Sequence, residues 1–242
     1  MNGHGTTLIE HLEALRRSLL LIAAAMFLAL PLTYWASSYA IEWLVKWCFP
    51  DGGELYFFSP MEAFWAQLKL ALVMALALTY PWNVFQLWKF VHPALYPKER
   101  RALGGWIMLS SLLFFGGGVF CVGAILPLVV RFATGFASPS LKPLIGLESF
   151  LELAGWLTFA FALMFQTPIV VYMAVRMGFV SSATLAAKRP YVVVVILVVA
   201  ALLTPPDVIS QVMLGIPTWL LFEVGLLMAR LAEKRAAADE KE

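Results

Sequence analysis

Six apolar stretches, each nearly free of charge, constrain this chain more than any other feature of its sequence. They cover residues 18–41, 70–88, 102–130, 153–175, 190–206 and 208–229. An α-helix needs about 20 apolar residues to cross the roughly 30 Å hydrocarbon core of a bilayer. The first four stretches meet that length. The pattern therefore predicts an all-α integral membrane protein with six transmembrane helices.

Composition excludes a water-soluble domain. Of the 242 residues, 62% are hydrophobic and 13% are charged, whereas soluble domains have roughly 45–50% apolar and about 25% charged residues. A soluble globule of this size could not cover so much apolar surface with polar side chains. The net charge of +2 by itself says nothing about nucleic acid or acidic substrates, and we expect no nucleic-acid partner.

Prolines and short helices are expected to bend the structure. Five of the stretches contain an internal proline, at Pro31, Pro81, Pro127, Pro168 and Pro217, and each proline removes a backbone hydrogen bond. The fifth stretch has about 14 helical residues between its prolines, or roughly 21 Å, and the sixth is also short. We therefore expect a curved wall of bent helices, with the bilayer thinned beside helices 5 and 6.

Lysine and arginine are distributed unevenly along the chain. Thirteen of them fall before the first stretch, in the second and fourth loops, and after the sixth stretch, whereas the other loops hold only Lys46, Arg131 and Lys142. Positive residues are retained in the cytoplasm. The distribution predicts a multi-pass protein with both termini in the cytoplasm. Residues 1–232 would form a single six-helix membrane domain, and residues 233–242 a flexible cytoplasmic tail.

No residue pattern typical of a metal site or an enzyme is present in the sequence. The two cysteines have no CxxC spacing and the histidines have no HExxH spacing, so we expect neither a metal nor a cofactor. An intramembrane enzyme would need a nucleophile with its base, or paired catalytic acids. We therefore expect a protein that is not an enzyme.

Two acidic residues precede the first apolar stretch. Glu10 and Glu13 lie ahead of Arg16 and Arg17, in a segment whose leucines recur at helical spacing. Glu13 and Arg17 are four residues apart, the spacing of an ion pair on one helix face. Either they form this pair, or Glu13 joins Glu99 in a cytoplasmic patch that binds a cationic partner through bidentate arginine contacts.

The second loop presents a single carboxylate among cations. It reads WKFVHPALYPKERR over residues 88–101, and its two X-Pro pairs favour a stiff, turned segment. Glu99 is its only acid. One interpretation is a surface ion pair with Lys98 or Arg100, which contributes about 0–1 kcal/mol. The other is the cation-binding patch shared with Glu13.

Polar residues inside the stretches are candidates for function. Gln166 lies near the middle of the fourth stretch and Glu223 in the sixth, where polar groups are costly. Gln166 either bonds carbonyls freed by Pro168 or lines a polar groove. Glu223 either pairs with a cation of the fourth loop or lines that groove. Lys69 is expected to extend toward the outer surface, and Gly116, Gly117, Gly118 and Gly123 are expected to allow close helix approach.

Several segments together resemble the TatC family, the polytopic subunit of the twin-arginine protein translocase. The resemblance rests on HLEALRRSL at 11–19, PMEAFWAQLKLAL at 60–72, FVHPALYPKERR at 90–101, KRPYVVV at 188–194 and LLTPPDVISQ at 202–211. FQTPIV at 165–170 and LFEVG at 221–225 add to it. These segments occur in family order over nearly the whole chain.

The resemblance implies a function that composition alone does not indicate. A TatC protein of the bacterial cytoplasmic (inner) membrane would form, with TatB, the receptor for twin-arginine signal peptides. With TatA it would export folded proteins, driven by the proton-motive force. The resemblance also implies contact with membrane lipid and a homo-oligomeric arrangement within the complex.

The resemblance assigns roles to particular residues. Glu99, with Phe90 and Arg100 in the same motif, would bind the signal peptide. The family's N-terminal glutamate stands where this chain has Ala14, so Glu13 or Glu10 would take its place.

A second set of residues would meet partner helices. Thr204, Asp207 and Gln211 match the family pattern and would contact helices of TatA or TatB. Some members carry an acid where Gln166 stands. The alternative function is a small-molecule secondary transporter or channel lined by Gln166 and Glu223. It predicts inverted repeats, which the sequence does not show.

Overall fold

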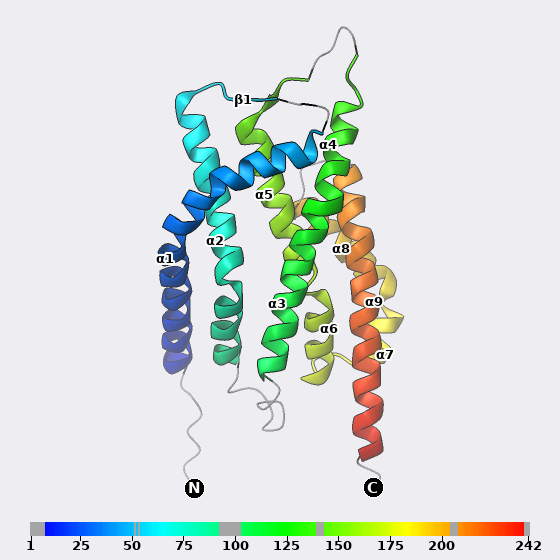
Figure 1. Ribbon diagram of the computed structural model, residues 1–242. Coiled ribbons are helices and arrows are strands. Elements are labelled where there is room, and N and C mark those ends of the chain that lie inside the picture. Colours follow the sequence, from blue (N-terminus) through cyan, green and yellow to red (C-terminus); the bar gives the residue numbers. More distant parts are fainter. Residues whose placement is uncertain are drawn as a thin grey trace.

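The computed structural model describes residues 8–50, 52, 54–91, 103–138, 143–203 and 208–239. Helices dominate it (Figure 1). They are α1 (Leu8–Cys48), α2 (Pro60–Val91), α3 (Leu103–Phe120), a π-helix η3 (Cys121–Ile125), α4 (Leu126–Thr134), α5 (Leu147–Met164), α6 (Thr167–Arg176), α7 (Ser182–Ala187), α8 (Arg189–Leu203) and α9 (Val208–Asp239). Two short strands, β1 (Leu55–Tyr56) and β2 (Ile145–Gly146), pair in parallel.

Five helical segments within the described ranges are long and apolar enough to cross a membrane. They are Leu12–Cys48, Pro60–Lys89, Gly104–Thr134, Leu147–Arg176 and Ser210–Lys234. Helix α8 is a further, shorter apolar helix of 15 residues, or about 22 Å. The all-α membrane fold is confirmed, and the fifth predicted helix is short as expected.

The sixth predicted helix is longer than the sequence analysis expected. Helix α9 has 32 residues and continues to Asp239, so it extends into the tail predicted from residue 233. Alanine, glutamate, lysine and arginine after Ala229 favour helix strongly. Glu233 also accepts hydrogen bonds from the backbone N–H and the hydroxyl of Ser182. These bonds tie this end of α9 to α7.

The prolines interrupt two of the spans. The fourth span breaks before Pro168, where α5 ends at Met164 and α6 begins at Thr167. The hydroxyl of Thr167 donates to the Met164 carbonyl at 2.6 Å, which takes the place of the backbone bond that proline cannot make. In the third span, the π-helix η3 lies directly ahead of α4, which has Pro127 in its first turn.

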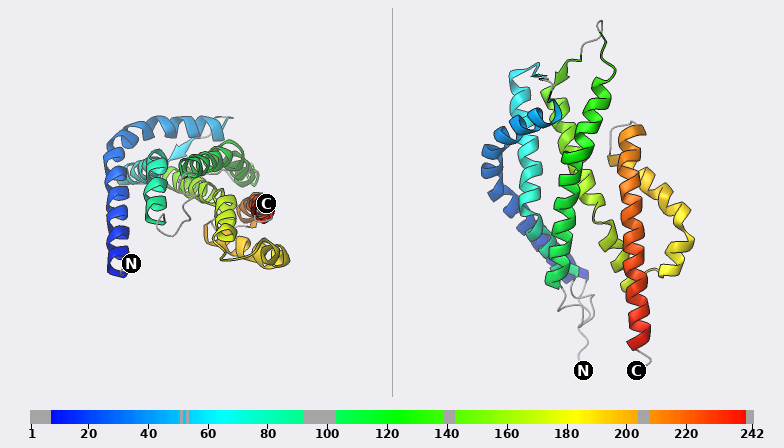
Figure 2. Two further views of the ribbon diagram at one scale, coloured as in Figure 1. Left: turned by 90° about the horizontal axis from the view of Figure 1, so that it is seen from below. Right: turned by 45° about the vertical axis from the view of Figure 1, so that its right-hand side comes forward.

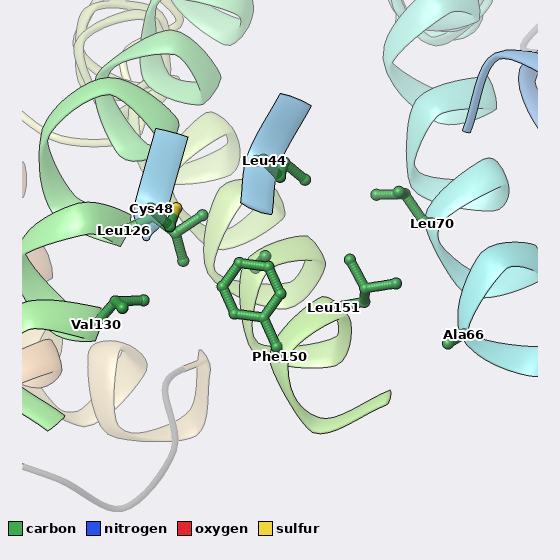
Figure 3. Packing of buried hydrophobic residues seen from close by; sticks show 9 residues of the cluster. Leu44, Cys48, Ala66, Leu70, Leu126, Val130, Phe150 and Leu151 are labelled. Atoms are coloured by element: carbon green, nitrogen blue, oxygen red, sulfur yellow. The ribbon is translucent and has the colours of Figure 1, made fainter. Parts of the chain in front are cut away.

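Helix α1 bends over the rest of the molecule. It contains Pro31, and its second half lies across the other helices at the upper end in Figure 1. This half packs on α2 and α4. Beneath it lies a buried apolar cluster that includes Leu44, Leu126 and Phe150 (Figure 3).

The helices do not close around a common axis. Helix α1 packs on α2, α2 and α3 pack on α5, and α6 and α8 pack on α9. In the view from below, α1 and α8 lie at opposite ends of the molecule (Figure 2). This open arrangement agrees with the expected curved wall. The start of α1 and the ends of α2, α6 and α9 all lie at the lower end in Figure 1.

Two glycines allow helices to approach closely. A Cβ atom on Gly117 of α3 would lie 2.7 Å from the Phe161 carbonyl oxygen of α5. A Cβ atom on Gly225 of α9 would lie 2.7 Å from Pro168 Cα in α6. Gly116 and Gly123 face open space instead. The predicted close approach in the third span therefore rests on Gly117 rather than on all four glycines.

Candidate functional site

A polar groove lies between the first turns of α1 and the last turns of α2. It encloses about 330 Å³ and is lined by Glu13, Ala14, Arg17, Ser18 and Leu21 of α1 and by Gln86 and Lys89 of α2. The two helices run antiparallel and pack along their length. These turns of α1 and α2 lie at the lower end of both helices in Figure 1. We call it the α1–α2 groove.

Among the residues that the structure describes, Glu13 is the one acid that lines the α1–α2 groove. Its side chain is exposed, and it forms no ion pair with any residue that the structure describes. The ion pair with Arg17, one of the two interpretations of the sequence, is therefore absent. Arg17 and Lys89 also line the groove. The Glu13 carboxylate therefore lies near two positive charges without forming an ion pair with either.

Several predicted binding residues fall outside the described part of the chain. Glu99, Arg100, Thr204 and Asp207 lie outside the described residues. The side chains of Glu10 and Phe90 are likewise outside them. The loop that contains Glu99 follows directly after α2, which ends at Val91, two residues beyond Lys89 of the groove.

Sequence reasoning missed two residues of the α1–α2 groove. Gln86 is 3% exposed and Ser18 is 8% exposed, so both are buried although they line the groove. The sequence contains only a weak signal that these two residues line a groove. Each is a single polar residue near the end of an apolar stretch, and such a position by itself does not show which neighbour the side chain faces.

Gln166 belongs to a polar network that joins three spans. Its carbonyl oxygen accepts a hydrogen bond from the Ser110 hydroxyl at 2.7 Å. Its amide nitrogen donates to the Ser110 carbonyl at 3.1 Å and to the Ala162 carbonyl at 3.5 Å. The Tyr80 hydroxyl bonds Ser110 at 3.1 Å. Gln166 therefore links α3 to the α5–α6 break, with Tyr80 attached from α2.

Glu223 pairs with a cation of the fourth loop, as one of the two interpretations proposed. The Arg189 Nε and Nη2 atoms donate to its two carboxylate oxygens at 2.6 and 2.8 Å. This fork-to-fork geometry is the strong form of an arginine–carboxylate contact. It joins the start of α8 to α9.

Two other predicted polar residues also find partners within the chain. The Gln211 amide donates to the Leu197 carbonyl of α8 at 3.0 Å. Lys69 contacts Glu148 at 2.7 Å and Glu152 at 3.2 Å, both on α5. Lys69, near the start of α2, therefore forms ion pairs with the first turns of α5.

An apolar hollow between five helical segments was not predicted from the sequence. It encloses about 470 Å³ between α1, α2, α3, η3 and α5, with Trp43 and Trp47 on its α1 side. The Trp47 indole N–H donates to the Val122 carbonyl at 3.0 Å, and its ring stacks on Trp43. The side of α1 that bends over the molecule thus also borders this hollow.

The described fold and its buried polar contacts define a multi-pass all-α membrane protein with an open helix arrangement. Comparison with known proteins then identifies the family. The family model for Sec-independent protein translocase protein (TatC) matches residues 10–217. The chain belongs to the TatC family, whose members are components of the twin-arginine protein-transport system.

Individual relatives cover almost the whole chain. A Sec-independent protein translocase protein TatC from Magnetococcus marinus is 34% identical over 236 residues, covering 96% of this chain and 87% of the relative. The TatC of Escherichia coli (strain K12) is 34% identical over 226 residues, covering 92% and 88%. A crystal structure of the twin arginine translocase receptor TatC superposes with a TM-score of 0.81 at 30% identity, covering 93% of this chain and all of that one.

Proposed function

We propose that this chain is the receptor subunit for twin-arginine signal peptides and that the α1–α2 groove is part of the binding site. The observation that carries the proposal is the carboxylate of Glu13, which lines the groove and pairs with no described cation. A carboxylate in this state can accept two parallel hydrogen bonds from a guanidinium group. A ligand with arginine side chains matches it.

The second carboxylate of the proposed site is Glu99. It belongs to the loop that follows α2, whose last turns form one wall of the α1–α2 groove. Two acids would serve two arginines, with Phe90 and Arg100 of the same motif shaping the site. Glu10 is the other N-terminal candidate.

The proposed orientation places the α1–α2 groove in the cytoplasm. Among the described residues, Arg16, Arg17, Lys89 and Arg230 lie toward the end where α1 begins and α9 ends, whereas Lys46 lies at the other end. The positive-inside rule then puts both termini in the cytoplasm. The membrane would be the bacterial inner membrane.

The proposed complex contains TatB in the receptor and TatA in the export step, which uses the proton-motive force. Thr204, Asp207 and Gln211 would meet partner helices beside α8. A helix of about 22 Å is shorter than the hydrocarbon core, so the bilayer would thin at this flank. A thinned bilayer would favour the approach of other short helices.

The transporter alternative receives no support from the polar residues that motivated it. Gln166 is bonded to Ser110 and Glu223 to Arg189, so both are satisfied within the chain. A substrate pathway would instead leave these groups available for a ligand.

Signal-peptide binding to the purified full chain in detergent tests the proposal. We expect a labelled peptide with paired arginines to bind more tightly than the same peptide with paired lysines, because lysine cannot make the bidentate contact. Glu13→Gln and Glu99→Gln should each weaken binding about 10–100-fold, the size expected for a lost hydrogen bond to a charged group. Glu42→Gln, at the other end of α1, is the matched control. Equal affinity for both peptides would contradict the proposal.

A further inference from the structure

The Gln86 side chain lines the α1–α2 groove, and its amide has no hydrogen-bond partner among the described residues. Its side chain is 3% exposed, it lines the groove, and no described residue hydrogen-bonds it. Ser18 lies on the α1 wall of the same groove, is 8% exposed and also has no hydrogen-bond partner among the described residues. Neither residue contributes to the fully buried atoms that have no partner, so the Gln86 amide and the Ser18 hydroxyl are accessible to a ligand in the groove.

Other polar residues of α1 and α2 satisfy themselves locally. Thr33 donates to the Ala29 and Leu30 carbonyls, and Ser37 donates to the Tyr34 carbonyl. Further along α2, the Gln67 amide donates to the Tyr34 carbonyl of α1 at 3.3 Å. Thr33, Ser37 and Gln67 therefore have partners within the two helices, whereas the Asn83 Oδ1 atom of α2 is buried without one. Gln86 differs because its amide faces the groove instead.

We propose that the Gln86 amide, with the Ser18 hydroxyl opposite, binds the main chain of the peptide that occupies the α1–α2 groove. A side-chain amide carries both donors and an acceptor, as a peptide group does. It can therefore bond the backbone N–H and C=O of one residue of an extended peptide, because these two groups point to the same side. This inference rests on the proposed function and assigns the contact that would hold the ligand's backbone.

The positions along the helices give the ligand a direction. Gln86 precedes Lys89 by three residues on α2, and Ser18 follows Glu13 by five on α1, so the amide and the hydroxyl lie about 4.5–7.5 Å further into the protein than the charged residues. Leu21 lies deeper again on α1. An arginine side chain would meet Glu13 at the mouth, the adjacent main chain would meet Gln86, and an apolar residue would follow toward Leu21.

A pair of matched variants on α2 tests the assignment. Gln86→Leu keeps the side-chain size and removes the amide. It should weaken twin-arginine peptide binding about tenfold, and it should leave the melting temperature unchanged or raise it, because Gln86 makes no hydrogen bond to a described residue that could be lost. Gln67→Leu should do the reverse, lowering the melting temperature and leaving peptide affinity unchanged. A Gln86→Leu protein with normal affinity would overturn the inference.

A second measurement identifies the contacted group on the peptide. A series of peptides is made in which each peptide is methylated at one backbone nitrogen beside the paired arginines. Methylation at one of these positions should weaken binding to the wild-type protein about tenfold and should not weaken binding to the Gln86→Leu protein. Equal losses on both proteins would overturn the main-chain contact. If Gln86→Leu instead changed only the amount of co-purified phospholipid, a lipid would be the occupant and the inference would be wrong. Failure of the proposed function itself would be seen separately, as equal wild-type affinity for paired arginines and paired lysines.

Discussion

Replacing Gly117 with alanine tests whether close packing of α3 on α5 holds the centre of the molecule together. The added Cβ atom would lie 2.7 Å from the Phe161 carbonyl oxygen, 2.9 Å from Ala162 Cα and 2.9 Å from Phe165 Cγ. Carbon atoms pack favourably at about 3.5–4.0 Å. Two of these contacts are backbone atoms of α5, which cannot rotate away, so the helices must separate by about 0.6 Å or more.

The separation has a predictable energetic cost. Phe161 and Leu157 of α5 are fully buried in the cluster next to this contact, and a gap of 0.5–1 Å loses about a quarter to a half of each dispersion contact. Overpacking of a buried site typically costs about 1–3 kcal/mol. In a chain of this length, 1 kcal/mol corresponds to roughly 2–4 °C in melting temperature. We expect a decrease of about 4–8 °C for a cost of about 2 kcal/mol.

Thermal unfolding in detergent, followed by tryptophan fluorescence, measures this change. Gly116→Ala is the control, since a Cβ atom at Gly116 meets nothing within 4 Å. Both variants make the same change in helix propensity in neighbouring positions of α3, so only the contact with α5 differs. If the two variants unfold at the same temperature, the close approach at Gly117 does not stabilise the protein.

Two further predictions concern one ion pair between helices and one tyrosine outside the spans. Arg189→Gln and Glu223→Gln should each lower the free energy of unfolding. Their double-mutant cycle should give a coupling energy of about 1 kcal/mol, because the pair is bidentate but its side chains are 43% and 28% exposed. Additive effects of the two substitutions on unfolding would contradict the pairing. The pKa of Tyr56, outside the spans, is raised because its hydroxyl bonds the Glu54 carboxylate, which repels the phenolate. Glu54→Gln should therefore move the tyrosine titration to lower pH in ultraviolet difference spectra, and an unchanged titration would show that this bond is not formed.

The membrane spans were predictable because hydropathy is set residue by residue. Each side chain that faces lipid contributes its own transfer free energy to membrane insertion. Residues 18–41 and 70–88 therefore indicate a span even when the residues that pack against them are not known. The breaks inside the spans were less predictable. Pro168 indicated a bend, but the separation of α5 from α6 also depends on Thr167 bonding the freed Met164 carbonyl.

The length of α9 was underestimated for a related reason. The prediction ended the last helix where apolarity ends, near Ala229, but helix formation continues in water when the residues favour it. The contact of Glu233 with Ser182 joins residues 51 positions apart, and no local pattern in the sequence indicates it.

The candidate site shows a different limit of sequence reasoning. Gln166 and Glu223 were selected because polar groups within a membrane are costly. That cost is met in two ways, by a partner within the chain or by a ligand, and residue type does not distinguish them. Gln166 and Glu223 have partners, so their presence is explained by packing. Gln86 and Glu13 have no described partner although both line the same groove. In a membrane protein, a polar residue that has no partner within the fold is therefore a better indication of a binding site than a polar residue that merely lies in an apolar stretch. In this chain, the antiparallel packing of α1 on α2 is needed to identify Gln86 and Glu13 as such residues.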